Sequence, residues 1–425
     1  MNTVKFYTLG CKVNQYETQV IREKFIKAGI EELEDSQPAD IYVINTCTVT
    51  HRADSESFSI IRKAKRENPK AKIVVTGCLT ELDEDKIKNI DGIDLIIKNK
   101  DKERILNRLF FQTSRTQKGI SFFKGHTRAF LKVQDGCDNF CSYCKVPLVR
   151  GASRSRPLDE IIREAKKLVK NGFKEIVLCG ICLGAYGKDF GEKFDLVDVI
   201  GALEKIDGLW RIRLSSIEAG DVSDRLIKRM AQTNLACRQT GKLCRHLHIP
   251  MQSGDDEILK KMHRSYSRKD YLNLINQIKK KVPQIGISTD VLVGFPGETE
   301  KNFQNTVELI KQVMPFKTHI FTYSKRIGTA AGNFKDEVNP IIIKRRILRL
   351  KKIADESAER VKRRFLNKRM EVLIESQPKE EPNIWQGYTN NYIKVRVKSE
   401  QNLKNQLVRT RLKKISKDCI EADLL

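Results

Sequence analysis

The sequence predicts an α/β protein built from a parallel α/β sheet, a partial barrel of βα units and a small all-β barrel. Short apolar runs alternate with helical stretches up to about residue 340, which is typical of parallel βαβ units. A basic helix follows, and the remaining residues alternate apolar and polar side chains, as short strands do. We place the domain boundaries at residues 1–120, 121–340, 341–366 and 367–425.

The first part contains four candidate strands, and a cysteine follows each of the first three. The strands are expected at Val4–Leu9, Ile41–Asn45, Ile73–Thr76 and Asp94–Ile97, and the cysteines are Cys11, Cys47 and Cys78. Parallel strands end along one edge of a sheet, where α/β proteins bind ligands, so we expect the three thiols to converge. A single such cysteine would be interpreted as a small buried residue. Three equivalent placements favour a cluster site with one open iron.

The second part contains six candidate strands separated by helices, which predicts a partial βα barrel. These strands are expected at Ala129–Val133, Glu175–Cys179, Arg211–Leu214, His246–Ile249, Gly286–Val293 and Thr318–Phe321. In βα barrels the chemistry takes place at the carboxyl ends of the strands.

A C-x3-C-x2-C motif, formed by Cys137, Cys141 and Cys144, directly follows the first of these strands. Thiolates favour iron–sulfur clusters or zinc. Three cysteines leave one iron of a four-iron cluster open to a small-molecule ligand. The alternative is a zinc site completed by a fourth ligand such as Cys182.

The third part begins with a basic helix. Residues 344–369 carry twelve Lys or Arg against three Asp or Glu, with apolar residues at helical spacing. Five short strands follow, which predicts an OB-like barrel. Basic residues alternate along two of these strands and predict a face that suits an RNA backbone: Lys394, Arg396, Lys398, Arg409, Arg411 and Lys413.

The net charge and the number of cysteines indicate which kind of partner and which cellular location to expect. The net charge is 80 − 54 = +26, which favours a polyanionic partner, with nucleic acid ahead of an anionic membrane surface. The sequence contains no run of about 18 apolar residues, so it predicts no membrane span. The first residues lack a secretory pattern, so we expect a cytoplasmic protein whose 11 cysteines are thiolate ligands or buried thiols.

Several segments together resemble the radical S-adenosylmethionine (SAM) methylthiotransferases, most closely the threonylcarbamoyladenosine or MtaB type. They are TLGCKVNQYE (residues 8–17), NTCTVT (45–50), TGC (76–78) and the C-x3-C-x2-C motif, and the resemblance covers nearly the whole chain. It implies SAM and two 4Fe–4S clusters, one held by Cys137, Cys141 and Cys144. The second, auxiliary cluster would be held by Cys11, Cys47 and Cys78. The resemblance also identifies residues 367–425 as a TRAM-like domain.

The family resemblance further implies the reaction. SAM at the open iron is cleaved to a 5′-deoxyadenosyl radical, the auxiliary cluster carries sulfur, and a second SAM methylates that sulfur. We expect SAM contacts from the cysteine loop and from later strand ends, although their Gly residues also suit ordinary turns. These candidate cofactor-binding residues are Tyr143, Gly180, Ser216, Glu218 and Gln252. The sequence assigns no catalytic side chain.

The implied substrate is N6-threonylcarbamoyladenosine at position 37 of tRNA, which would gain a methylthio group at C2. Isopentenyladenosine in tRNA and an aspartate of a ribosomal protein are the alternatives within the family. A non-catalytic RNA-binding protein with structural zinc is the alternative from another class. The family resemblance implies tRNA and an electron-donor protein of the reductase or flavodoxin type as partners, and the sequence assigns no oligomeric state.

Other candidate residues remain open. Cys179 and Cys182 form a C-x2-C pair that we interpret as incidental, and Cys237 with Cys244 is a weak zinc candidate. His246 and His248 share a strand face, where we expect packing or hydrogen bonding ahead of a metal pair. The segment RGASRSRP (150–157) places three arginines near the cysteine loop, either to neutralise a carboxylate or phosphate or as a solvated loop.

Overall fold

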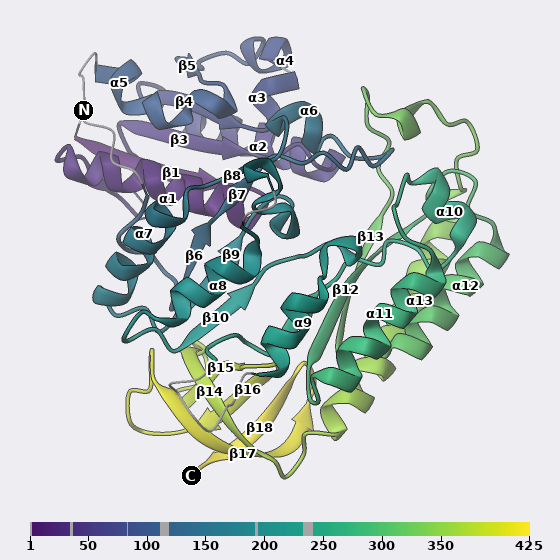
Figure 1. Cartoon of the computed structure of the whole chain (residues 1–425). Helices are drawn as coiled ribbons and strands as arrows, with labels where there is room; N and C mark the ends of the chain where they lie inside the picture. The colour runs from purple at the N-terminus through teal and green to yellow at the C-terminus, as the bar shows by residue number, and fades with distance from the viewer. Residues whose placement is uncertain (1, 35–36, 83, 111–118, 192–193, 233–240) are drawn as a thin grey trace.

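A computed structural model describes residues 2–34, 37–82, 84–110, 119–191, 194–232 and 241–425. Figure 1 shows the amino-terminal sheet at the top, the larger βα region in the middle and the carboxyl-terminal barrel at the bottom. The predicted α/β class with a small all-β part is therefore confirmed. Among the described helices, none has the length and apolar character needed to cross a membrane.

The amino-terminal sheet is entirely parallel, in the order β2-β1-β3-β4-β5. Its strands are β1 (Thr3–Thr8), β2 (Glu31–Glu32), β3 (Ile41–Thr46), β4 (Lys72–Gly77) and β5 (Leu95–Ile96). Helices α1 (Lys12–Lys27), α2 (His51–Glu67), α3 (Leu79–Leu82) and α4 (Glu84–Lys88) lie between these strands along the chain, and α5 (Ile105–Phe110) follows the last strand. The four predicted strands are present, and the sequence missed only the short β2. The strand order reverses between β1 and β3, which is where such sheets bind ligands.

The central region consists of two three-stranded parallel sheets, joined by bridges from Ile212 to Leu243 and from Ser216 to His248. Its six strands are β6 (Arg128–Lys132), β9 (Glu175–Cys179), β10 (Arg211–Leu214), β11 (His246–His248), β12 (Gly286–Val293) and β13 (Lys317–Thr322). They confirm the predicted partial barrel of six βα units. A two-stranded hairpin, β7 (Gln134–Asp135) with β8 (Arg154–Ser155), brackets the cysteine loop.

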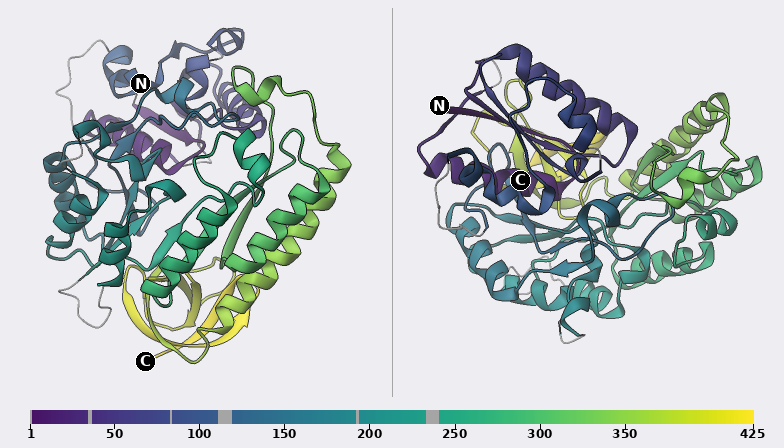
Figure 2. Two further views of the ribbon diagram at one scale, coloured as in Figure 1. Left: turned by 45° about the vertical axis from the view of Figure 1, so that its right-hand side comes forward. Right: turned by 90° about the horizontal axis from the view of Figure 1, so that it is seen from above.

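Helices cover the outside of these strands, and α11, α12 and α13 pack side by side (Figures 1 and 2). The helices of this part of the chain are α6 (Val146–Arg150), which packs against α3, and then α7 (Leu158–Lys170), α8 (Leu196–Glu204), α9 (Asp224–Ala231), α10 (Asp256–Lys261), α11 (Arg268–Lys281) and α12 (Glu300–Val313). Capping boxes start several of them, for example Ser267 with Asp270 at α11. The apolar faces of the helices and strands form one continuous core.

Helix α13 spans Pro340–Arg363, so it begins before the predicted basic stretch and ends before Arg369. Its apolar stripe is buried as predicted, with Leu350, Ala354 and Val361 inside. The closed barrel that follows has the order β14-β15-β16-β18-β17. Its strands are β14 (Arg369–Ser376), β15 (Ile384–Thr389), β16 (Lys394–Lys398), β17 (Leu407–Ser416) and β18 (Cys419–Leu424).

The carboxyl-terminal barrel covers the amino ends of the central strands. Arg211, at the start of β10, donates to the carbonyls of Tyr388 at 2.9 Å and Glu371 at 2.8 Å. Arg213 reaches the carbonyls of Thr389 and Asn390 at 3.2 and 3.1 Å. The chemistry-bearing strand ends therefore lie at the opposite end of the central region from this barrel.

A buried ionic cluster forms this contact. Glu175 is completely buried, and its Oε1 lies 2.6 Å from Nε of Arg213 and 3.8 Å from Nη1 of Arg128. Burial by itself would raise the pKa of Glu175, but Arg213 and Arg128 hold it below the ordinary value. The ring of Tyr392 lies 4.5 Å from the Arg213 guanidinium and 5.2 Å from that of Arg128. Glu175 is thus the shared carboxylate of a cationic cluster.

We predict that Glu175→Gln lowers the free energy of unfolding by about 3–5 kcal/mol, because it leaves buried guanidinium groups without their counter-charge. Urea denaturation of the full chain measures this. Asp159→Asn is the matched control, since Asp159 pairs with Arg163 on the surface and its loss should cost about 0–1 kcal/mol. Equal stability of the two variants would contradict the role given to Glu175.

Candidate active site

In the loop that carries Cys137, Cys141 and Cys144, one backbone hydrogen bond fixes the start of the loop and another closes a turn at its end. Cys137 N donates to the Gly151 carbonyl at 3.1 Å, and Cys144 N donates to the Cys141 carbonyl at 3.0 Å. Gly136 has φ +74°, and a Cβ on it would lie 1.9 Å from the Ala152 carbonyl oxygen, so only glycine fits there. The loop therefore holds three thiols at the carboxyl end of β6.

Ser142 fixes the middle of this loop to the end of α10. Its N donates to the Met262 carbonyl at 3.1 Å, and its Oγ donates to the Lys261 carbonyl at 2.7 Å. Arg264, two residues after Met262, lies with its Nη1 3.2 Å from Sγ of Cys141 and also pairs with Glu218. A cation beside these thiols stabilises their anionic form, which is the form that binds metal.

Burial raises the pKa of two of these three thiols, Cys141 and Cys144. It raises the pKa of Cys144 to about 12, and the neighbouring Cys141 and Cys137 contribute in the same direction. Burial also raises the pKa of Cys141, although Arg264 opposes it. Metal binding at this loop must therefore displace thiol protons. Three half-buried thiols beside a buried cation suit an iron–sulfur cluster with one open iron.

The five residues expected to contact SAM lie in the cysteine loop or after strands β9, β10 and β11. Tyr143 packs edge-on against Phe295, and Glu218 reaches the loop through Arg264. The remaining three, Gly180, Ser216 and Gln252, follow those strands. The structure thus brings the candidates to one end of the central region, and their contact with SAM stays a prediction.

Two of these positions have unusual backbone requirements. A Cβ on Gly180 would lie 2.8 Å from Oε1 of Gln134, so the loop approaches that side chain closely. Gln252 has φ +62°, and its N donates to the Asp290 carbonyl at 2.8 Å. Both features fix the loops around the space in front of the cysteines.

Cys182 lies beside the cysteine loop. Its Sγ is 3.6 Å from Nδ2 of Asn139 and 3.4 Å from Oδ2 of Asp221, and a hydrogen bond with Cys182 lowers the pKa of Cys137. Cys179 is completely buried, and burial raises the pKa of its thiol. Cys244 is a buried free thiol, whereas Cys237 lies outside the described residues.

Cys11, Cys47 and Cys78 follow β1, β3 and β4, as the sequence predicted. Cys11 is exposed, while Cys47 and Cys78 are buried. Gly10 has φ +88°, and a Cβ on it would lie 2.8 Å from Sγ of Cys47, so this turn brings the β1 and β3 ends together. Burial raises the pKa of Cys47 to about 11, and nearby Cys78 and Cys11 add to the rise. The structure therefore gathers the three thiols at the switch point of the sheet.

A buried ionic cluster connects the two cysteine-bearing regions. Glu17 of α1 accepts from Lys102 at 2.6 Å, from Lys132 of β6 at 2.7 Å and from Arg150 at 3.1 Å. Arg150 also pairs with Asp135 at 2.9 Å. Burial would raise the pKa of Glu17, but these cations hold it well below its ordinary range.

This arrangement decides between the alternatives for the arginine-rich segment. Arg150 is buried against Glu17, and Arg156 pairs with Glu164 at 2.7 Å, so both neutralise carboxylates of the protein. Arg154 is exposed and donates to the Arg150 carbonyl. Sequence reasoning also missed Glu17 and Arg264, because no local spacing shows that a residue meets a partner more than a hundred positions away.

Comparison with known proteins agrees with this geometry. Residues 3–98 match the uncharacterized protein family UPF0004, and residues 131–310 match the radical SAM superfamily. A radical S-adenosylmethionine methyltransferase, TsrM from Kitasatospora setae, with cobalamin and a [4Fe-4S] cluster bound, shares the fold. It superposes with a TM-score of 0.55 at 14% identity, over 78% of this chain and 76% of that one. The chain is a radical SAM enzyme, a class that uses SAM and a 4Fe–4S cluster.

Proteins of similar sequence show to which family of radical SAM enzymes the chain belongs. The chain is 38% identical to the threonylcarbamoyladenosine tRNA methylthiotransferase MtaB of Bacillus subtilis, over 97% of this chain and 94% of that protein. It is 34% identical to the tRNA-2-methylthio-N(6)-dimethylallyladenosine synthase of Clostridium tetani, over 90% and 87% of the two chains. The chain belongs to the tRNA methylthiotransferase family of radical SAM enzymes.

We predict that replacing Cys137, Cys141 or Cys144 with Ala abolishes formation of 5′-deoxyadenosine from SAM, because we expect each thiol to hold one iron of the cluster. Anaerobic assay with dithionite and chromatographic detection of 5′-deoxyadenosine measures this. Cys419→Ala is the matched control, since Cys419 is a buried thiol of the carboxyl-terminal barrel and its loss should leave the activity intact. Activity in any of the three loop variants would show that this loop does not hold the cluster.

Proposed function

We propose that this chain adds a methylthio group to C2 of N6-threonylcarbamoyladenosine at position 37 of tRNA. The observation that supports this substrate is identity of 38% and 39% to MtaB proteins of Bacillus subtilis and Chlamydia pneumoniae, over 97% and 88% of this chain. Identity to proteins named for dimethylallyladenosine is lower, at 34% and 33%. Isopentenyladenosine is therefore the second candidate substrate.

The proposal assigns a 4Fe–4S cluster to each cysteine set. Cys137, Cys141 and Cys144 would hold the cluster that binds SAM, and Cys11, Cys47 and Cys78 would hold an auxiliary cluster. When bound, the first supplies the electron for SAM cleavage and the second the sulfur that becomes the methylthio group. A radical is needed because the C2–H bond of adenine is not acidic enough for a side-chain base.

The residues of this chain would orient and shield these groups. Tyr143, Gly180, Ser216, Glu218 and Gln252 line the strand ends next to the cysteine loop and are the proposed SAM contacts. The Glu17 cluster fixes the amino-terminal sheet against β6, and we expect both cysteine sets to face a shared space. This division assigns residues 1–120 to the auxiliary cluster and residues 121–340 to SAM.

The carboxyl-terminal barrel, residues 367–425, and the helix before it, residues 341–366, would bind tRNA. A groove of about 1310 Å³ lies between α13 and the barrel, and its lining includes the exposed Lys351, Lys352, Lys413 and Lys414. The alternation predicted for β16 and β17 is present, because Val395, Val397 and Leu412 point inward. Such a groove suits a phosphate backbone. We further propose a cytoplasmic location and a flavodoxin-type electron donor.

Complementation tests the proposed function. In cells that lack the gene, mass spectrometry of tRNA nucleosides should show N6-threonylcarbamoyladenosine without its 2-methylthio form, and the wild-type gene should restore that form. The methylthio derivative of isopentenyladenosine should be unchanged. If only the isopentenyl derivative responds, the substrate is the second candidate, and if neither nucleoside changes, the proposed function is wrong.

A triple variant in which Cys11, Cys47 and Cys78 are replaced by Ala tests the auxiliary cluster. We predict that it keeps roughly half of the iron, since one of two four-iron clusters remains. It should still cleave SAM under reducing conditions but form no methylthio nucleoside. Full iron content would show that these thiols hold no cluster, and methylthio product would show that the sulfur comes from elsewhere.

A further inference from the structure

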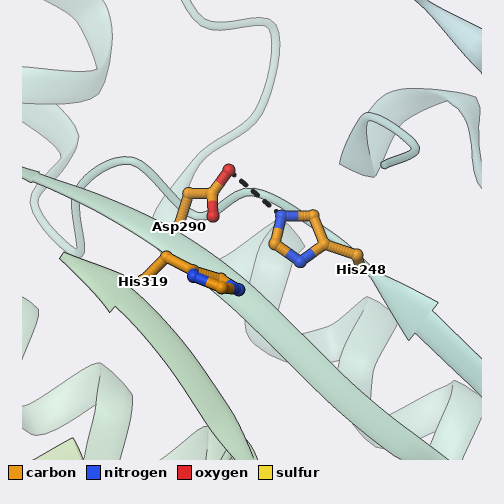
Figure 3. Close-up of side chains that lie close together, drawn as sticks. All are labelled: His248, Asp290 and His319. Atoms are coloured by element: carbon orange, nitrogen blue, oxygen red, sulfur yellow. Dashed lines mark ion pairs between the residues drawn. The ribbon is translucent and has the colours of Figure 1, made fainter. Parts of the chain in front are cut away.

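Three side chains outside both cysteine sets gather inside the central region: His248 of β11, Asp290 of β12 and His319 of β13 (Figure 3). One ligand atom from each lies within 4.8 Å of the other two. Nε2 of His248 is 3.0 Å from Oδ2 of Asp290, and the two imidazole rings are 5.6 Å apart. Two imidazoles and a carboxylate therefore converge on one point.

The sheet register produces this convergence. His248 is paired with Ser288, and Asp290 is paired with His319 on the next strand. Because side chains alternate along a strand, Ser288 and Asp290 share one face of β12. The opposite face belongs to the helix-side core, which includes Leu247 and Val291, with Ile320 packed against it. The three side chains thus point away from the helices, into the interior of the partial barrel.

A second layer of hydrogen bonds orients His248. Its Nδ1 lies 2.9 Å from Oγ of Ser288, and that Oγ is 3.0 Å from Nε2 of His246. The hydroxyl fixes the ring so that Nε2 is directed toward Asp290. An outer partner on the second imidazole nitrogen is the usual arrangement for histidines that bind metal.

We propose that His248, Asp290 and His319 form a binding site for a divalent transition-metal ion of the zinc or iron(II) class. Imidazole nitrogen suits these ions, whereas calcium and magnesium prefer oxygen-only sites. Two imidazoles and one carboxylate also supply the three protein ligands that an open site for such an ion uses. The site contains no cysteine and does not depend on the tRNA substrate proposed above.

The backbone connects this site to the loops around the cysteines. Ile217 N donates to the His248 carbonyl at 3.0 Å, and Gln252 N donates to the Asp290 carbonyl at 2.8 Å. Ser216 and Gln252, two of the proposed SAM contacts, are therefore direct neighbours of the ligand strands. An ion with three protein ligands keeps a coordination position open, as catalytic zinc sites do, so it can bind an oxygen of water or substrate.

Zinc binding by the full-length, anaerobically reconstituted protein tests the site. After incubation with zinc chloride and dialysis, we expect about one zinc per chain, with nitrogen and oxygen scatterers at about 2.0–2.1 Å in zinc K-edge X-ray absorption. Zinc bound only through sulfur at about 2.3 Å would place the ion on cysteines and overturn the proposal. Absence of retained zinc in the wild-type protein would also overturn it.

Near-isosteric variants identify the ligands. Asp290→Asn and His319→Gln should lower zinc affinity at least about 100-fold, and Ser288→Ala, which removes only the outer partner, about 10- to 100-fold. His51→Gln is the matched control, since His51 is an exposed histidine of α2, and it should bind zinc as the wild type does. Iron content of the same samples reports folding independently. Wild-type zinc affinity in all three site variants would contradict the assignment.

Discussion

The contact between Glu17 and three cations determines how the two cysteine-bearing regions face each other. Glu17 lies on the helix that directly follows Cys11, while Lys132 and Arg150 flank the loop of Cys137, Cys141 and Cys144. Such a cluster fixes the relative position of the two regions, because moving one region away would leave a buried charge without its partner. Both cysteine sets are thereby held to one side of the central strands.

A second ionic cluster fixes the other end of the same strands. Glu175 with Arg128, Arg211 and Arg213 seats the carboxyl-terminal barrel on the amino ends of β6, β9 and β10. The carboxyl-terminal barrel and the cysteine loop of the candidate active site therefore lie at opposite ends of the central strands. Helix α13 runs beside β13 and connects the two ends, so its basic face extends the surface available to a long polyanion.

The sequence predicts most of the architecture because its signals are local. Apolar runs and a cysteine placed directly after a strand need only a few neighbouring residues, and the corresponding strands are present. The residues at which helices and strands begin and end are predicted less accurately. For example, β16 begins at Lys394, directly after a turn in which Tyr392 adopts φ +72° and places its ring next to Arg213. No local pattern predicts that turn.

The candidate site is predictable only in part, for a similar reason. The six cysteines lie where their spacing indicated, but the partners that orient them are distant in sequence. Arg264 contacts Cys141, and Glu17 contacts Arg150, although the residues of each pair are more than a hundred positions apart in the sequence. The net charge of +26 overstates the positive charge available to RNA, because Arg150, Arg211 and Arg213 are buried in ionic clusters.

The central claim is that the Glu17 cluster aligns two separate cofactor sites, and Glu17→Gln tests it most directly. Asp135 still pairs with Lys132 and Arg150 in this variant, so both regions should fold and keep wild-type iron content. The measurement is the ratio of methylthio nucleoside to 5′-deoxyadenosine formed in a single reaction with tRNA. We predict unchanged SAM cleavage in the absence of tRNA and a ratio lowered by about 100-fold, the effect of misaligning reactive groups by about 1 Å. A wild-type ratio in a fully iron-loaded variant would contradict this claim.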